Sequence, residues 1–333
     1  MAPVVAPPFT ATGVRRLARG LARGSAAERR SLMREAFFRV AERYTPAVAA
    51  EFEDMRLYLS THDRVVSVAT FCGGPFELEF LERAVAALAS AGHDVRGRRF
   101  VEVGANIGTT TVPLVVRFGA AGGLAIEPEP GNARLLDVNV AANDLLDRVQ
   151  TLRAAVSDRA GTTRLALAAD NHGDHRLATG EADGSPAIEV DTVTLDGLVD
   201  DGRIDPAATG VVWVDVQGHE GRVLAGATRL REAGVPFAVE FVPDLLVEAG
   251  NLELFLEHAS AFRSLVDLRT SGGELGHVRG LPRRRGPGDG PAAAALTARR
   301  RCGCMPRGAA GMGRRGGEPL AASPDAPPTK ESP

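Results

Sequence analysis

The sequence is poor in several residue types, and each scarcity excludes a class of protein. Cysteine occurs only at Cys72, Cys302 and Cys304, which is too few for a disulfide framework. No apolar run approaches the roughly 20 residues that span a membrane, and no long apolar stretch follows the N-terminal arginines, so we expect no secretory signal. A net charge of −3 argues against nucleic-acid binding through a broad basic face. We therefore expect a soluble, cytoplasmic protein without a nucleic-acid or membrane partner.

Hydrophobic residues make up 44% of the chain, enough for a sizeable core, and composition divides it into four regions. Residues 1–24 are rich in proline, alanine, glycine and arginine, and we expect them to be disordered. Residues 25–96 predict an N-terminal extension of helices and a hairpin, and residues 97–270 predict the main domain. Residues 271–333 lack apolar periodicity, which predicts a disordered tail.

The extension begins with a helix signal. Ser25 followed three residues later by Glu28 predicts a capping box for a helix from Ala26. Residues 56–71 predict two short strands around a polar turn, and residues 77–90 predict a second helix.

From Arg98 onward, short apolar strands alternate with amphipathic segments. We expect strands over 100–103, 124–126, 149–156, 163–168, 187–193, 211–216, 236–241 and 265–268, and helices over 107–118, 132–143, 220–232 and 252–262. Such alternation predicts an α/β fold, a mostly parallel sheet with helices on both faces. Ligands of such sheets bind at the carboxyl ends of the strands.

The first candidate site follows the strand over 100–103. Glu102 and the turn Gly104-Ala105-Asn106-Ile107-Gly108 lead from this strand into a helix. Glycines let a backbone approach a ligand closely, and a helix N-terminus offers free amide donors. A nicotinamide enzyme would show G-x-G-x-x-G, but here asparagine takes the place of the second glycine. The turn therefore favours a small ligand with an amino-acid end over a dinucleotide.

Acidic residues end three further strands. Glu127 follows the second strand, where a carboxylate can accept both hydroxyls of a ribose. Asp215 ends the strand over 211–216, and His219 follows it as a second candidate base because its ordinary pKa is near neutral. Glu240 lies in an apolar strand, where a carboxylate is costly to bury unpaired, and it is either a pocket residue or a salt-bridged rim residue.

Two clusters have residue types that bind metals. One is the loop Asp170-Asn171-His172-Gly173-Asp174-His175, and the other is the pair Cys302 and Cys304. The cysteine pair has no further ligands nearby, and a loop of the first kind is more often solvated than metal-bound. We therefore expect no metal and interpret the loop as a lid.

Together these motifs resemble the FkbM-type methyltransferases, a family within the class I, Rossmann-like methyltransferases. The resemblance covers roughly residues 77–268 and rests on several motifs in the family's order. They are VEVGANIG at 101–108, AIEPEPGNARLLDVNVAAN at 125–143, AVS at 155–157, VDTVTLDGLV at 190–199 and VDVQGHEGRVLAGA at 214–227.

The resemblance implies S-adenosylmethionine as cofactor, with Asp215 and its turn facing the transferred methyl and Glu127 on the ribose. It implies a small-molecule acceptor whose hydroxyl is methylated, such as a sugar, polyketide or other secondary metabolite. The cofactor-binding residues that we expect are Glu102, Gly104, Ala105, Asn106, Gly108, Glu127 and Asp215, and the candidate catalytic residues are Asp215, His219 and Glu240.

The chain departs from the family at two places. Trp213 stands where many relatives have lysine, which indicates a different pocket. The class usually completes its sheet with an antiparallel strand pair, and here only residues 276–281 offer a weak second strand. Two alternatives stay open: a non-catalytic module that binds S-adenosylmethionine, and a nicotinamide-dependent oxidoreductase. The sequence does not indicate an oligomeric state.

Overall fold

The structure is a computed structural model that describes residues 11–178, 186–262, 264–268 and 293–298. The chain divides into two compact units, residues 1–300 and residues 301–333, and the second lies outside the described residues. The Cys302 and Cys304 pair and residues 276–281 also lie outside them. Among the helices that the structure describes, none combines the length and the apolar character needed to cross a bilayer.

The main sheet confirms the predicted Rossmann-like α/β fold. Every strand pair in it is parallel. The strands lie in the order β12 (Ser264–Asp267), β13 (Ala293–Ala298), β11 (Phe237–Phe241), β10 (Thr209–Val214), β3 (Arg99–Val103), β4 (Gly122–Ile126) and β5 (Val149–Leu152).

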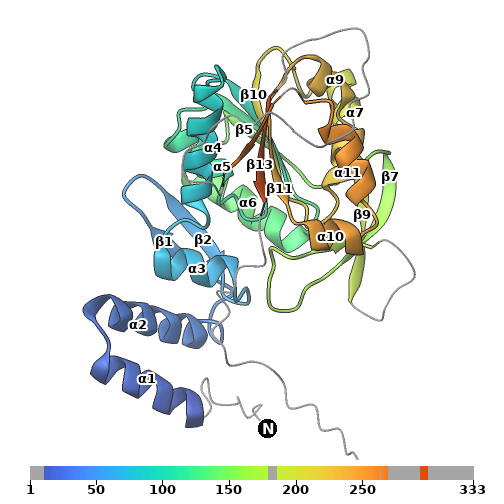
Figure 1. The fold of residues 1–333 in the computed structure, drawn as a ribbon. Helices are drawn as coiled ribbons and strands as arrows, with labels where there is room; N and C mark the ends of the chain where they lie inside the picture. The colour runs from blue at the N-terminus through green and yellow to red at the C-terminus, as the bar shows by residue number, and fades with distance from the viewer. Residues whose placement is uncertain (1–10, 179–185, 263, 269–292, 299–333) are drawn as a thin grey trace, which may run out of the picture. The chain divides into compact units, whose positions relative to one another are not determined.

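Helices cover both faces of this sheet (Figure 1). One face carries α4 (Leu78–Ser90), α5 (Thr111–Val116) and α6 (Pro130–Ala142). The other carries α7 (Leu195–Asp200), α8 (Glu220–Ala225), α9 (Thr228–Glu232), α10 (Pro243–Glu248) and α11 (Leu252–Ala259). The helix predicted over 220–232 is therefore two short helices, and α5 is shorter than the predicted 107–118.

Alternation along the strands divides the core in two. Phe100 and Ala238 pack on the side of α4 to α6, whereas Val101 and Val239 pack on the side of α7 to α11. Glu102 and Glu240 have the same parity as Phe100 and Ala238, which puts both carboxylates on the first face. Trp213 is buried in the first core, so it is a packing residue of that core.

A smaller sheet follows the order β6 (Ala155–Val156), β9 (Ala187–Val193), β7 (Gly161–Ala166) and β8 (Arg176–Leu177). The strands expected over 163–168 and 187–193 correspond to β7 and β9. The single strand predicted over 149–156 is divided into β5 and β6, which belong to different sheets. The loop that contains His172 and His175 therefore connects β7 with β8.

In the N-terminal extension, α2 (Ala26–Ala41) has the predicted capping box from Ser25 and Glu28. β1 (Ala47–Glu51) pairs antiparallel with β2 (Arg56–Ser60). The second strand predicted within 56–71 is wrong, because α3 (Val66–Gly73) begins there. The Asp63 carboxylate accepts hydrogen bonds from the Val65 and Ser67 amides, and such bonds to the first free amides stabilise a helix start.

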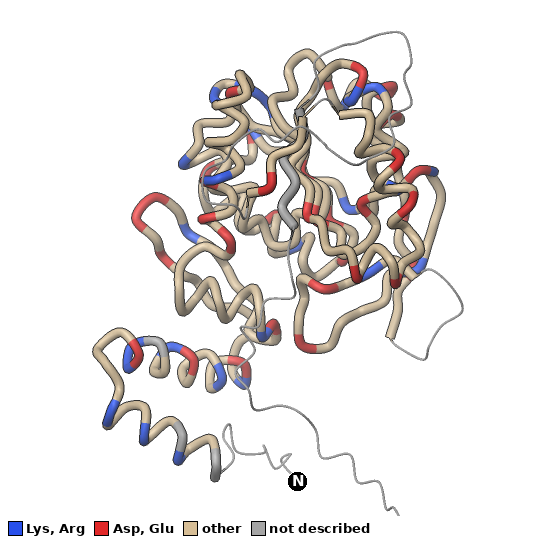
Figure 2. The backbone as a smooth tube through the Cα atoms, in the orientation of Figure 1, with Lys and Arg blue, Asp and Glu red and all other residues tan. Residues whose placement is uncertain are grey.

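The structure describes ordered elements in both terminal regions that the sequence predicted to be disordered. Residues 11–23 form α1 (Ala11–Arg23), in which Leu17 and Leu21 are half-buried and arginines recur along the helix (Figure 2). Alanine and arginine are good helix formers, so the composition that suggested disorder also suits an amphipathic helix.

In the C-terminal region, residues 293–298 form β13, between β11 and β12. It is parallel to both neighbours, so the described part of the sheet has no antiparallel pair at this edge, and the candidate strand over 276–281 lies outside the described residues. The remaining residues of the predicted disordered segments are outside the described ones.

Candidate functional site

The turn after β3 lies against the end of β10. Gly104, Asn106 and Gly108 all have positive φ angles, of 84°, 51° and 89°. A Cβ atom added to Gly104 would lie 1.9 Å from the Asp215 carbonyl oxygen, and one on Gly108 would lie 3.0 Å from a Leu136 methyl carbon. Ala105 is buried. The glycines are therefore required by packing within the protein, whereas the sequence interpretation assigned them to a ligand.

Two buried carboxylates lie beneath this turn. Glu102 on β3 accepts a hydrogen bond from the Thr111 hydroxyl, and burial raises its pKa to about 8. Glu127, after β4, accepts hydrogen bonds from the Asn106 and Glu129 amides, each at 2.9 Å, and burial raises its pKa to about 7. Glu127, which was predicted to bind the ribose, thus contacts Asn106 in the turn that was predicted to bind the methionine part of the cofactor.

Asn106 leaves one polar atom free in this turn. Its side-chain nitrogen donates to the His172 carbonyl oxygen at 3.3 Å. Its Oδ1 atom is buried and has no hydrogen-bond partner among the described residues. A buried carbonyl oxygen without a donor is costly, so this atom is suited to accept a hydrogen bond from a bound ligand.

Asp215 and Glu240 form a carboxyl pair at the ends of the neighbouring strands β10 and β11. Their side chains are hydrogen-bonded to each other. Burial raises the pKa of both, and the negative charge of Asp215 raises that of Glu240 further. We infer that Glu240 holds a proton and donates it to an ionised Asp215, because environments that separate two pKa values assign acid and base. Glu240 is therefore paired, but with a carboxyl group instead of a cation.

Gln217 contacts both members of this pair, a role that the sequence did not suggest. Its Nε2 atom lies 2.6 Å from Asp215 Oδ1 and 2.7 Å from Glu240 Oε2. A glutamine next to a turn glycine carries no signal by itself, and the contact depends on β10 and β11 being neighbours.

His219 lies in a different environment from the carboxyl pair. Its Nε2 atom is 3.0 Å from the hydroxyl oxygen of Ser157, which follows β6. Burial lowers the His219 pKa to about 4, so the ring is neutral at pH 7. His219 is therefore held next to Ser157 as a neutral imidazole, apart from the carboxyl pair.

The loop between β7 and β8 lies over the turn of Asn106. The backbone amide of His172 donates to the Asp63 carboxylate at 3.2 Å. The carbonyl oxygen of His172 accepts hydrogen bonds from the side-chain amides of Asn106 and of Asn132, the latter at 2.8 Å. The backbone of His172 is therefore held through both its amide and its carbonyl group, by residues that the sequence did not connect.

The histidines of this loop are engaged with the protein. His175 Nδ1 accepts a hydrogen bond from the Ala168 amide at 3.0 Å, and burial lowers the pKa of His175. Asp174 pairs with Arg176 at 2.7 Å. Among the residues that the structure describes, no three histidine, cysteine or acidic side chains are grouped so that they could hold a metal ion.

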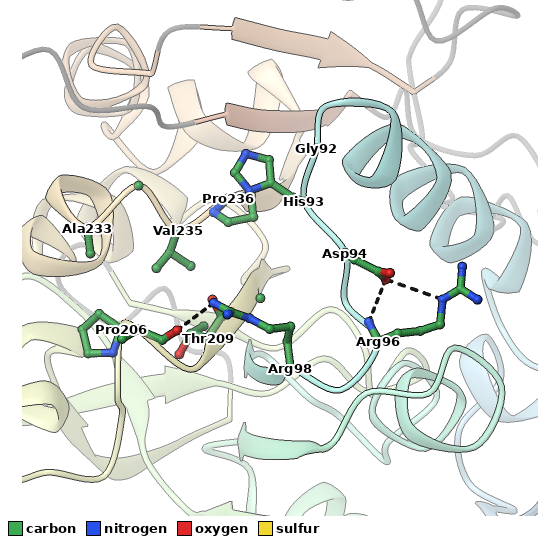
Figure 3. A pocket seen from close by; sticks show the side chains of 13 residues that line it. Gly92, His93, Asp94, Arg96, Arg98, Pro206, Thr209, Ala233, Val235 and Pro236 are labelled. Atoms are coloured by element: carbon green, nitrogen blue, oxygen red, sulfur yellow. Dashed lines mark hydrogen bonds and ion pairs between the residues drawn. The ribbon is translucent and has the colours of Figure 1, made fainter.

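A hollow of about 420 Å³ lies at the opposite rim of the sheet, at the amino ends of β3, β10 and β11 (Figure 3). Its charged groups are occupied: Asp94 pairs with Arg96, and Arg98 donates to the carbonyl oxygens of Ala207 and Thr209. Because ligands of parallel sheets bind at the carboxyl ends, the rim with Asn106, Glu127 and Asp215 is the candidate site.

Comparison with known proteins agrees with the sequence resemblance. The model of the methyltransferase FkbM domain matches residues 102–261, which contain every candidate site residue. No curated protein is detectably similar to the chain.

Solved structures resemble the chain over part of its length. Methyltransferase FkbM from Methylobacillus flagellatus KT is 18% identical, with a TM-score of 0.29, and the match covers 41% of this chain and 30% of that one. PRMT6-SAH is 14% identical, with a TM-score of 0.25, over 53% of this chain and 40% of that one. The chain thus spans less than half the length of either structure, and the assignment depends on the family match and on the site's own residues.

Proposed function

Residues 102–261 place this chain in the FkbM methyltransferase family, and from that premise we propose that it methylates a hydroxyl oxygen with S-adenosylmethionine as donor. The acceptor that we propose is a sugar, a polyketide or another small secondary metabolite. The observation that carries the proposal is the Asp215–Glu240 carboxyl pair at the carboxyl rim, beside the turn of Gly104 and Asn106.

The residues at this rim fit the proposed cofactor. The unpartnered Oδ1 of Asn106 would accept a hydrogen bond from the ammonium group of the methionine part. The Glu127 oxygens accept one backbone amide each and have lone pairs left for ribose hydroxyls. Glu102 is buried against Thr111 beneath the turn, and it supports the site from below.

The chain's own residues then have two tasks. When bound, S-adenosylmethionine supplies a methyl group made electrophilic by its sulfonium. The rim residues orient the acceptor oxygen in line with that methyl group, and such alignment contributes several kcal/mol (roughly) to the rate. The Asp215 carboxylate takes the hydroxyl proton as the new oxygen–carbon bond forms and the sulfur–carbon bond breaks, which would leave S-adenosylhomocysteine. Glu240 keeps the proton it already holds, so after the transfer the pair carries two protons and no charge, and it releases one proton before the next turnover.

The experiment measures methyl transfer from labelled S-adenosylmethionine to a panel of sugars and polyketide alcohols, together with calorimetric binding of S-adenosylhomocysteine. Asp215→Asn removes the base but keeps the side-chain size. We expect turnover to fall about 100-fold or more, with cofactor affinity within about threefold. Asp191→Asn, at an exposed position of β9, is the matched control and should change neither quantity.

Other outcomes would favour the alternatives. Equal losses of turnover and affinity would make Asp215 a binding residue. Cofactor binding without transfer to any acceptor would indicate a non-catalytic binding module. Binding of a nicotinamide dinucleotide in place of S-adenosylhomocysteine would indicate an oxidoreductase. The cytoplasmic location and the absence of nucleic-acid and membrane partners stay predictions.

A further inference from the structure

The turn from Asp215 to Glu220 holds a glutamine in an unusual backbone conformation. Gln217 has a φ of 54°, in the left-handed region, and Gly218 follows with a φ of 102°. Gly218 is required there, because an added Cβ would lie 2.9 Å from the Leu245 carbonyl oxygen. A glutamine at a left-handed position costs conformational energy that glycine would avoid, and such strain is concentrated at functional sites.

The backbone of this turn is determined by groups other than the Gln217 side chain. The buried Glu220 carboxylate accepts hydrogen bonds from the Val216 amide at 3.2 Å and the Gly218 amide at 3.1 Å. The Asn251 side chain donates to the Gly218 carbonyl oxygen at 2.9 Å. The turn would therefore keep its shape with another residue at position 217, and the side chain of Gln217 has a separate task.

That side chain bridges the carboxyl pair. A primary amide has two hydrogens on one nitrogen, and the distances from Nε2 to Asp215 Oδ1 and Glu240 Oε2 are 2.6 and 2.7 Å. One hydrogen can thus point at each carboxyl group while the two carboxyl groups bond to each other. We propose that Gln217 is a positioning residue, which holds Asp215 and Glu240 together as a pair that shares one proton and carries one negative charge. This inference rests on the proposed methyltransferase function.

The surroundings of the pair oppose that charge. Glu102 on β3, Glu220 on α8 and Asp174 in the loop before β8 are acidic groups that interact with the pair, and each of them, when ionised, disfavours further negative charge on it. Arg176 is paired with Asp174. Donation from the Gln217 amide stabilises the ionised form of the pair, so it lowers the pH at which the pair takes up its second proton. Without the amide, the pair becomes neutral at a higher pH.

The charge of the pair can be tested by ligand binding alone, without a methyl acceptor. S-adenosylmethionine carries a positive charge on sulfur that S-adenosylhomocysteine lacks. A negatively charged pair therefore favours the first ligand, and this preference is lost as the pair is protonated. The experiment measures the dissociation constants of both ligands by calorimetry from about pH 5 to about pH 9 and takes their ratio. Glu127 and Glu102 also titrate in this range, with pKa values of about 7 and about 8, so the part of the midpoint that moves between the unaltered protein and the Gln217 variants reports the titration of the pair.

We expect Gln217→Met, which keeps the side-chain length without donors, to move this midpoint up by about one pH unit. Gln217→Gly should show the same shift while unfolding at an equal or higher urea concentration, because glycine relieves the left-handed strain. A purely structural role would instead destabilise the protein and leave the midpoint in place. Gln150→Met, at an exposed position of β5, is the matched control.

An unshifted midpoint in both Gln217 variants, with both ligands bound, would overturn this inference and leave the proposed function intact. Failure of the unaltered protein to bind either ligand at any pH would overturn the proposed function and this inference with it.

Discussion

At the scale of single residues, three buried carboxylates in and around the site are held by backbone amides. Glu127 accepts the Asn106 and Glu129 amides, Glu220 accepts those of Val216 and Gly218, and Asp63 accepts three, including that of His172. Backbone donors are fixed by the fold and do not rearrange when charge develops nearby. The rim is therefore preorganised for a polar ligand before the ligand arrives.

Gly104 offers a test of how closely the first turn packs on β10. Gly104→Ala would combine an unfavourable positive φ with a Cβ atom 1.9 Å from the Asp215 carbonyl oxygen. We expect a loss of about 3 kcal/mol or more in the free energy of unfolding, measured by urea denaturation. Gly92→Ala is the matched control, since Gly92 has the same φ of 84° but no atom within 4 Å of the added Cβ.

Gly92→Ala should lower the free energy of unfolding by about 1 kcal/mol, from backbone conformation alone. Equal costs for the two variants would mean that the turn moves away from β10 at little expense. The contact between Gly104 and Asp215 would then not define the site.

At the scale of elements, β13 joins two strands of the main sheet. It lies between β11 and β12, so the backbone of β12 reaches the sheet only through it. β11 carries Glu240, and its pairing on that side is with β13 from Phe237↔Ala294 to Phe241↔Ala298. A short strand near the end of the chain thus supports the strand that holds half of the carboxyl pair.

Truncation tests this role. A chain that ends before β13, at residue 292, should lose on the order of 5 kcal/mol of unfolding free energy through its strand hydrogen bonds. A chain that ends at residue 300 removes only the second compact unit and should unfold at the same urea concentration as the full chain. Equal stability of the two truncated chains would show that β13 does not complete the sheet.

At the scale of the whole molecule, residues far apart in sequence meet over the site. Asp63 comes from the N-terminal extension, Asn106 from the turn after β3, Asn132 from α6 and His172 from the loop between β7 and β8. Asn139 on α6 also binds the backbone of Tyr58 on β2 and the Ile107 carbonyl oxygen. The extension is therefore part of the site's construction.

Substitution of Asp63 would separate these segments. Asp63→Ala leaves three backbone amides without their acceptor. We expect it to lower the free energy of unfolding by about 2 to 3 kcal/mol. Hydrogen exchange at the His172 amide should become faster by a larger factor than exchange in the central strands. Asp191→Ala, on the exposed side of β9, is the control and should leave exchange unchanged. Unchanged exchange at His172 in Asp63→Ala would mean that other contacts hold the loop.

Local patterns in the sequence were sufficient for the central strands β3, β4 and β10 and for the candidate rim at their carboxyl ends. Apolar strands that are followed by Gly104, Glu127 and Asp215 specify parallel strands, and parallel strands bring their carboxyl ends to one edge. The capping box of Ser25 likewise depends only on neighbours three residues apart. For such features the determining interactions lie within one element, so the sequence by itself determined them.

Only the tertiary structure decided which groups face each other across elements. The pairing of Glu240 with Asp215, and the amide of Gln217 between them, require β10 and β11 to be neighbours in register. The contact of Asp63 with His172 spans 109 residues of chain. The strand character of residues 293–298 arises from hydrogen bonds to β11 and β12, because their alanine-rich sequence favours a helix as much as a strand. Contacts of this kind depend on distant partners, which no local pattern encodes.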